Sequence, residues 1–194
     1  MTIHVSSARQ YRIRERREWA TIVLSEWRAA QPAAYCGEML IHSSFGSWAY
    51  VWHACGVPFR QFLLECDFDY LMSKLMHSRF RVFDAVASSR ELSRAVLRAR
   101  RMTDIDRTEA RALWDALKDF SMHRALSAHE FVNQACAIAQ DMSERGLPRA
   151  SRLMREPWEA ITQQPSPQAE GFWNTIWPVM CEQLRTECAQ PVQG

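Results

Sequence analysis

The sequence predicts an α+β fold, in which an antiparallel meander comes first and a set of α-helices packs against it. Apolar and polar residues alternate over Ile3–His53, as in strands whose successive side chains face opposite ways. After Gly56 apolar residues recur three and four positions apart, which is the period of a helix packed on a core. We see no linker, so we expect a single domain, 1–194, with strands mainly in 1–55 and helices mainly in 56–190.

Two long alternations and one short one predict a meander of three to five strands. The first alternation, Trp19–Trp27, places its odd-numbered side chains on one face and its even-numbered ones on the other. The second strand, Glu38–Ser44, follows a loop, and Phe45–Ser47 predicts a turn into a third strand. Three aromatic residues share one face of that strand: Trp48, Tyr50 and Trp52.

Helix start signals predict about five to six helices after the sheet. Pro58 suits the first helical position because its φ is already helical and it lacks an N–H group. Asp67 suits the N-cap of a second helix, and Ser88 or Ser89 that of a helix running to about Arg101. Each of these side chains can accept a hydrogen bond from a backbone N–H group in the first turn.

The later helices are bounded by a capping box and by prolines. Ser127–Glu130 has the capping-box pattern, and the helix that it begins can end at Gly146. A last helix is predicted from Phe172 to about Thr186, with Pro178 near its start or at a kink.

Length and composition favour a folded protein of the cytosol. The 194 residues are 47% hydrophobic and 24% charged, which suits one globular domain with a real core. No apolar run approaches the roughly 18 residues that cross a bilayer, and Met1–Arg17 lacks the apolar core of a signal peptide. Six irregularly spaced cysteines indicate reduced thiols rather than a disulfide framework.

Four arginines share one face of the helix predicted to end near Arg101. At 100° per residue they fall within about 80° of one another, opposite the apolar residues of that helix. They are Arg90, Arg94, Arg98 and Arg101. The ordinary interpretation is a solvated face, whereas the functional one is binding to nucleic-acid phosphates or to an acidic protein surface.

The aromatic residues of the third strand have two interpretations of the same kind. Tryptophan and tyrosine bury large areas, so a place in the core is the ordinary interpretation of Trp48, Tyr50 and Trp52. If they are exposed, they become contact anchors, because Trp, Tyr and Arg dominate interface energetics. We therefore predict partner binding through these three residues and the four arginines.

Signals for catalysis or for a metal are weak. Cys36, His42, His53 and Cys55 carry possible zinc-binding groups, but they lack the paired spacing of structural zinc sites. Asp67 is explained as a helix cap, and no phosphate-binding glycine loop or nucleophile elbow is present. We predict no catalytic residue, metal ligand or cofactor, and keep an enzyme or zinc protein as an alternative.

Three segments carry a resemblance to a known family. Gly37–Leu63 reads GEMLIHSSFGSWAYVWHACGVPFRQFL, Asp67–Tyr70 reads DFDY and is followed by Lys74, and Gly171–Pro178 reads GFWNTIWP. Together they resemble a family of small accessory proteins encoded by phages and prophages. The resemblance implies expression inside a bacterium from a mobile element, and it supplies no catalytic residues.

These observations lead to one hypothesis and its alternatives. We expect a phage or prophage accessory protein of the bacterial cytoplasm that binds a host protein or ribonucleoprotein. Inhibition of a defence system such as CRISPR–Cas, in the manner of an anti-CRISPR, is the expected effect. The alternatives are a nucleic-acid-binding factor that uses the basic helix, and an enzyme or zinc protein built around His42, His53, Cys55 and Asp67.

Overall fold

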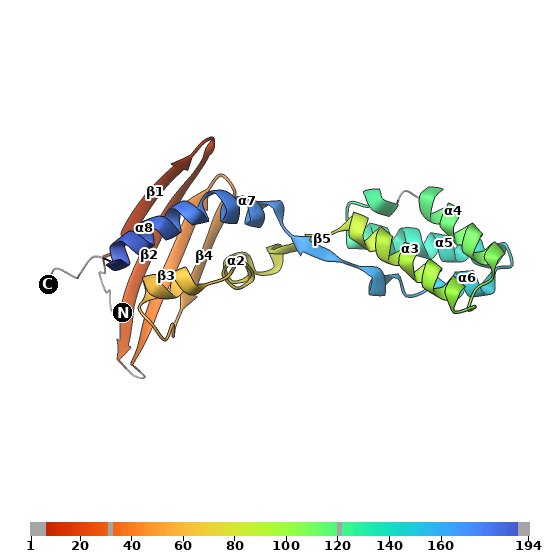
Figure 1. Cartoon of the computed structure of the whole chain (residues 1–194), viewed down its shortest axis with the longest axis horizontal. Coiled ribbons are helices and arrows are strands. Elements are labelled where there is room, and N and C mark those ends of the chain that lie inside the picture. Colours follow the sequence, from red (N-terminus) through yellow and green to blue (C-terminus); the bar gives the residue numbers. More distant parts are fainter. Residues whose placement is uncertain (1–6, 31–32, 120–121, 190–194) are drawn as a thin grey trace, which may run out of the picture. The chain divides into compact units, whose positions relative to one another are not determined.

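The computed structural model describes residues 7–30, 33–119 and 122–189, which divide into two compact units (Figure 1). The sheet unit is formed by the chain up to Phe80 together with the chain from Pro165 onward. The helical unit is Arg81–Gln164, inserted between those two parts. That the chain forms a single domain, 1–194, stays a prediction from the sequence.

The sheet unit begins with four antiparallel strands in the order β1-β2-β3-β4. This meander confirms the predicted fold class and lies within the expected three to five strands. The strands are β1 (Arg9–Glu15), β2 (Glu18–Ala30), β3 (Ala33–Ser43) and β4 (Gly46–Trp52).

Alternation along β2 and β3 gives the sheet one buried face. Ile22 lies opposite Ile41 in the register, and Leu24 lies opposite Met39, with all four side chains buried. The residues between them, such as Leu40, point to the other face, where Leu40 is 40% exposed. The register therefore places the core on a single side of the sheet, as the sequence predicts.

Four helices complete this core, two from the chain before the insertion and two from the chain after it. The helices α7 and α8 lie across the sheet (Figure 1), and residues of all four helices belong to its hydrophobic cluster. They are α1 (Phe59–Glu65), α2 (Phe68–Met76), α7 (Pro167–Thr175) and α8 (Trp177–Ala189).

The helix starts show which capping signals were correctly interpreted. The Asp67 carboxylate accepts a hydrogen bond from the Tyr70 backbone N–H at 2.7 Å, as predicted. Pro58 occupies the N-cap of α1 rather than its first helical position, so that helix begins one residue later than predicted. The single helix predicted from Phe172 is in fact two helices, α7 and α8, because the helix is interrupted at Ile176. Pro178 lies near the start of α8, where its missing N–H costs nothing.

The helical unit has a hydrophobic cluster of its own, which includes Leu92, Leu113, Phe131 and Ile138. Its helices are α3 (Ala85–Arg101), α4 (Arg107–Asp119), α5 (Ala128–Glu144) and α6 (Pro148–Leu153). Short 3-10 turns are η1 (His77–Arg79) in the sheet unit, and η2 (Met122–Arg124) and η3 (Pro157–Ala160) in the helical unit. The described residues thus form eight α-helices, more than the expected five to six. The additional ones are the short α6 and the extra helix that results from the division of the last one.

The cap of α3 differs from the prediction. Asp84, rather than Ser88 or Ser89, accepts a hydrogen bond from the Ala87 N–H at 2.9 Å, so the helix begins earlier. Ser88 is instead buried, and its hydroxyl accepts a hydrogen bond from the Thr162 N–H at 2.9 Å. The Ser127 hydroxyl caps α5 and the helix ends before Gly146, as predicted, but the Glu130 carboxylate accepts from the Leu126 N–H instead of closing the capping box at Ser127.

Two short strands form the passages into and out of the helical unit. They are β5 (Arg81–Phe83) and β6 (Gln163–Pro165), which pair as a separate two-stranded sheet. The Ser166 N–H donates to the Phe80 carbonyl at 2.8 Å, and the Asp84 N–H donates to the Thr162 carbonyl at 2.9 Å. The two passages therefore run in opposite directions, hydrogen-bonded to each other. No helix among the described residues is long and apolar enough to cross a membrane.

We predict that Gly37→Ala destabilises the protein by about 1–3 kcal/mol, the usual cost of overpacking a core. A Cβ atom at Gly37 would lie 2.2 Å from the ring of Phe59, a side chain only 1% exposed. Phe59→Leu removes part of that ring, so in urea unfolding the double variant should lose less stability than the two single variants summed. If the stability losses of the two single variants simply added in the double variant, the Phe59 ring would not be the cause of the destabilisation by Gly37→Ala.

We predict that Glu187→Gln lowers the free energy of unfolding at neutral pH by about 1–2 kcal/mol. Glu187 on α8 accepts hydrogen bonds from Arg9 and Tyr11 at 2.9 Å and from Arg60 at 3.1 Å. Burial favours its neutral form, but these bonds and one from Gln183 outweigh burial and lower the pKa of Glu187. Burial and the bond to Glu187 raise the pKa of Tyr11 to about 12, which keeps the phenol a donor.

The sign of the pH dependence follows from the lowered pKa of Glu187. Its contribution is complete above the ordinary glutamate pKa and is lost as the pH falls through the lowered pKa of the folded state. The stability difference between the wild type and Glu187→Gln should therefore shrink on acidification. Glu182→Gln, on the same helix but outside this network, is the matched control; a pH-independent difference would contradict the account.

Candidate interaction surface

The four predicted arginines lie on the exposed side of α3. Arg90, Arg94, Arg98 and Arg101 are all exposed, while Leu92, Val96 and Ala99 of the same helix are buried. The amphipathic pattern predicted from the sequence is therefore present, and we call these four residues the arginine face. Partner binding by the arginine face stays a prediction.

The arginine face is largely uncompensated by acidic groups. Arg94 pairs with Glu91, the one carboxylate within α3. Within the described ranges, Arg90, Arg98 and Arg101 form no ion pair or side-chain hydrogen bond. Val86 and Leu97, each 45% exposed, add apolar area to the same side of the helix. Exposed guanidinium groups beside apolar side chains are the composition that protein interfaces favour.

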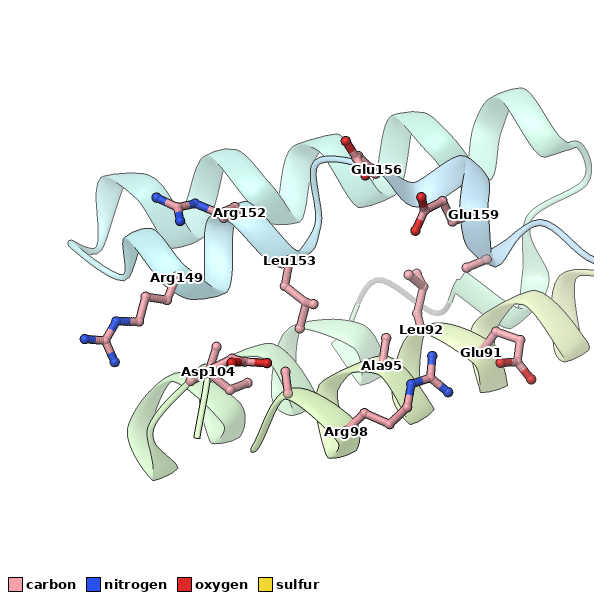
Figure 2. A pocket seen from close by; sticks show the side chains of 13 residues that line it. Glu91, Leu92, Ala95, Arg98, Asp104, Arg149, Arg152, Leu153, Glu156 and Glu159 are labelled. Atoms are coloured by element: carbon pink, nitrogen blue, oxygen red, sulfur yellow. The ribbon is translucent and has the colours of Figure 1, made fainter. Parts of the chain in front are cut away.

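An open groove of about 590 Å³ borders this surface on one flank of α3 (Figure 2). One wall is α3 with the loop that follows it, and the other is α6 with η3. Leu92 and Leu153 point into the space between the two walls (Figure 2). Arg98 belongs both to the arginine face and to the lining of the groove, so the two features form one continuous surface.

The charges around the groove are mixed in sign. On the wall formed by α6 and η3, Arg149 and Arg152 lie toward one end and Glu159 toward the other (Figure 2). None of these three side chains forms an ion pair within the part of the chain that the structure describes. This wall can therefore offer donors at one end and acceptors at the other. The opposite wall carries charges of both signs, with Asp104, Arg98 and Glu91 among its lining residues. Sequence reasoning missed the α6 wall, because no local periodicity links α6 to α3.

The three predicted aromatic residues of β4 lie against the core of the sheet unit. Trp52 is 4% exposed, and Trp48 meets Phe172 edge to face with ring centroids 5.3 Å apart. Tyr50 is half-buried and lies 4.7 Å from Trp52 between ring centroids. Their role as contact anchors stays a prediction, and Trp52 has little accessible area to offer a partner.

The residues considered for zinc or catalysis are held in other interactions. The Cys36 thiol donates to the His53 carbonyl at 3.0 Å, and His42 Nδ1 lies 2.8 Å from the Ser47 hydroxyl on the exposed side of the hairpin. Asp67 is the cap of α2. Among the described residues, no group of three or more His, Cys, Asp or Glu side chains could hold a metal ion.

Three thiols of the sheet unit favour their protonated form. Burial, reinforced by the nearby Asp67, raises the pKa of Cys66 to about 12. Burial likewise raises the pKa of Cys55, with Cys36 adding to it, and that of Cys181, which Arg185 partly opposes. A thiol with a raised pKa is a poor nucleophile at neutral pH, so these environments do not activate a cysteine.

The fold and this surface define an α+β protein whose inserted helical unit presents a basic, partly apolar surface beside a groove of mixed charge. The profile of a phage family matches residues 1–186. The chain belongs to this phage family. No curated protein and no solved structure matches the chain.

We predict that iodoacetamide modifies Cys136 and Cys188, which are exposed, at least about tenfold faster than Cys66 in the folded protein. The raised pKa of Cys66 leaves little thiolate there. Mass spectrometry of tryptic peptides at successive times gives the rates, and a urea-unfolded sample is the control in which the differences should vanish. Rapid modification of Cys66 in the folded state would contradict its raised pKa and make it a candidate nucleophile.

Proposed function

We propose that this phage protein binds a protein or ribonucleoprotein of its bacterial host and thereby inhibits a defence system, such as CRISPR–Cas. The observation that carries the proposal is the arginine face of α3, on which Arg90, Arg98 and Arg101 have no partner within the described chain. A guanidinium group forms paired hydrogen bonds with carboxylates and phosphates. An acidic partner surface would supply those acceptors.

The surroundings of the arginine face favour a protein partner. Val86 and Leu97 are exposed beside the arginines, and the neighbouring groove combines an apolar floor with charges of both signs. A uniformly basic surface would suit phosphates alone, whereas the acidic Glu156 and Glu159 would repel them. Mixed charges around apolar contacts suit a protein surface, where charge complementarity sets partner choice.

The setting supports the same proposal. A phage protein that acts after infection meets the machinery of the bacterial cytoplasm, where we place this chain. The sheet unit would support the helical unit, because the chain enters the helical unit from the sheet unit through β5 and returns to it through β6. Inhibition would then follow from occupying a surface that the host complex needs.

Nucleic-acid binding is the second candidate, and the same arginine face favours it. Four arginines along one helical side can neutralise successive phosphates and release counterions. Such binding would weaken steeply with salt, since the logarithm of affinity falls by about 0.9 per phosphate contact per logarithm of salt concentration. Affinity for a protein partner would depend less steeply on salt.

We predict that the tagged protein captures a stoichiometric protein partner from a bacterial lysate with active defence systems, and that this partner survives nuclease treatment. The double variant Arg94→Ala/Arg98→Ala should reduce the captured amount at least about tenfold, because arginine is enriched among interface hot spots and a loss of about 1.4 kcal/mol lowers affinity tenfold. Quantitative mass spectrometry of treated and untreated halves gives the measurement.

Arg111→Ala/Arg145→Ala is the matched control, because both arginines are exposed on the helical unit but lie outside α3 and pair with Asp115 and Asp141. Capture that disappears with nuclease would favour the nucleic-acid candidate. Undiminished capture by the Arg94→Ala/Arg98→Ala variant would contradict the role of the arginine face.

A further inference from the structure

A second hollow, which we call the α3–α4 pocket, lies on the flank of α3 opposite the groove. Its volume is about 380 Å³, within the roughly 300–1,000 Å³ range of small-ligand sites. At 100° per residue, Val86, Ser89 and Ser93 fall on one side of the arginine face and Glu91, Ala95 and Ala99 on the other. Its lining includes Val86, Ser89, Arg90, Trp114, Leu117 and Lys118.

The pocket has apolar walls. Val86 from α3 and Leu117 from α4 line it, together with the ring of Trp114 and the side chain of Met122. Val86 is 45% exposed, so it presents apolar area that a ligand could cover. Covering such area releases about 25 cal/mol per Å². A large apolar side chain of a partner is therefore suited to this space.

The charged side chains that line the pocket are all basic. Arg90 and Lys118 carry the positive charges, His123 adds an imidazole, and no carboxylate lines the pocket within the described ranges. The Lys118 Nζ lies 5.8 Å from the centroid of the Trp114 ring, which places its charge at the aromatic wall. An anionic group entering beside Trp114 would meet positive charge from both α3 and α4.

We propose that the α3–α4 pocket binds an acidic, apolar segment of a protein partner, with a large apolar side chain on Trp114 and a neighbouring carboxylate at Arg90 and Lys118. The inference deepens the proposed function and rests on it, because Arg90 belongs both to the pocket and to the arginine face. One partner surface that covers the arginine face would reach the pocket without a break. The pocket then selects partners by an apolar residue next to Asp or Glu.

The test uses a fluorescein-labelled synthetic peptide, Glu-Glu-Leu-Phe-Glu-Asp, and measures its affinity for the full chain by fluorescence anisotropy. Arg90→Gln and Lys118→Gln should each weaken binding about tenfold, as expected for hydrogen bonds to a charged group. Both side chains are exposed, so neither substitution should shift the thermal unfolding midpoint. Arg111→Gln on α4, outside the pocket, is the control and should bind like the wild type.

Two altered peptides test the chemistry of the ligand. Replacing every Glu and Asp by Gln and Asn, or replacing Leu and Phe by Ser, should abolish measurable binding. Equal binding of the neutral peptide, or an unchanged affinity of the Lys118→Gln variant, would overturn the inference. Preferential binding of a labelled oligonucleotide that is lost in the Lys118→Gln variant would also overturn it, because it would assign the pocket to phosphate.

The outcomes separate this inference from the proposed function. A lysate partner that depends on Arg94 and Arg98 but not on Lys118, and that the peptide does not displace, would overturn the role of the pocket and leave the proposed function standing. Peptide binding with the predicted variant effects, but no captured host partner, would support the pocket and remove the proposed function.

Discussion

The fold depends on one packing constraint, which is that the apolar face of the sheet is closed by helices from both sides of the insertion. Phe172 of α7 meets Trp48 of β4 edge to face, and residues of α8 share the same hydrophobic cluster. The chain must therefore return to the sheet after leaving it at Phe80. Residues 81–164 become an insertion whose two passages, β5 and β6, pair with each other. The insertion has its own hydrophobic cluster, so its surface can be devoted to contacts.

The sequence allowed the local parts of this arrangement to be predicted. Alternation along β2 identified its buried face, and Asp67 was correctly interpreted as a helix cap. It did not allow the return of the chain to be predicted, because closure of the sheet by α7 depends on contacts far apart in sequence. Ser88 was mistaken for a cap for a related reason: its hydroxyl is used by Thr162, which only the folded chain brings near.

The candidate surface shows the same division between local and distant information. Helical periodicity placed the four arginines on one exposed side of α3, and the structure confirms that placement. The hollows on the two flanks of the helix were not predictable, since α4 and α6 form their opposite walls. Arg98 borders the groove and Arg90 borders the α3–α4 pocket, so a partner seated on the arginine face would contact both. We therefore regard the surface of α3 and its two flanks as one interaction unit.

The central claim, that the partner sits on α3 of the helical unit, is tested most directly by site-specific photo-cross-linking in the host cell. A benzophenone amino acid would replace Leu97 on α3 or, as the matched control, Leu40 on the exposed face of the sheet; the two side chains are 45% and 40% exposed. The account predicts a discrete cross-linked protein from position 97 and none from position 40. A cross-link from position 40 alone would contradict it and would move the interaction surface to the sheet.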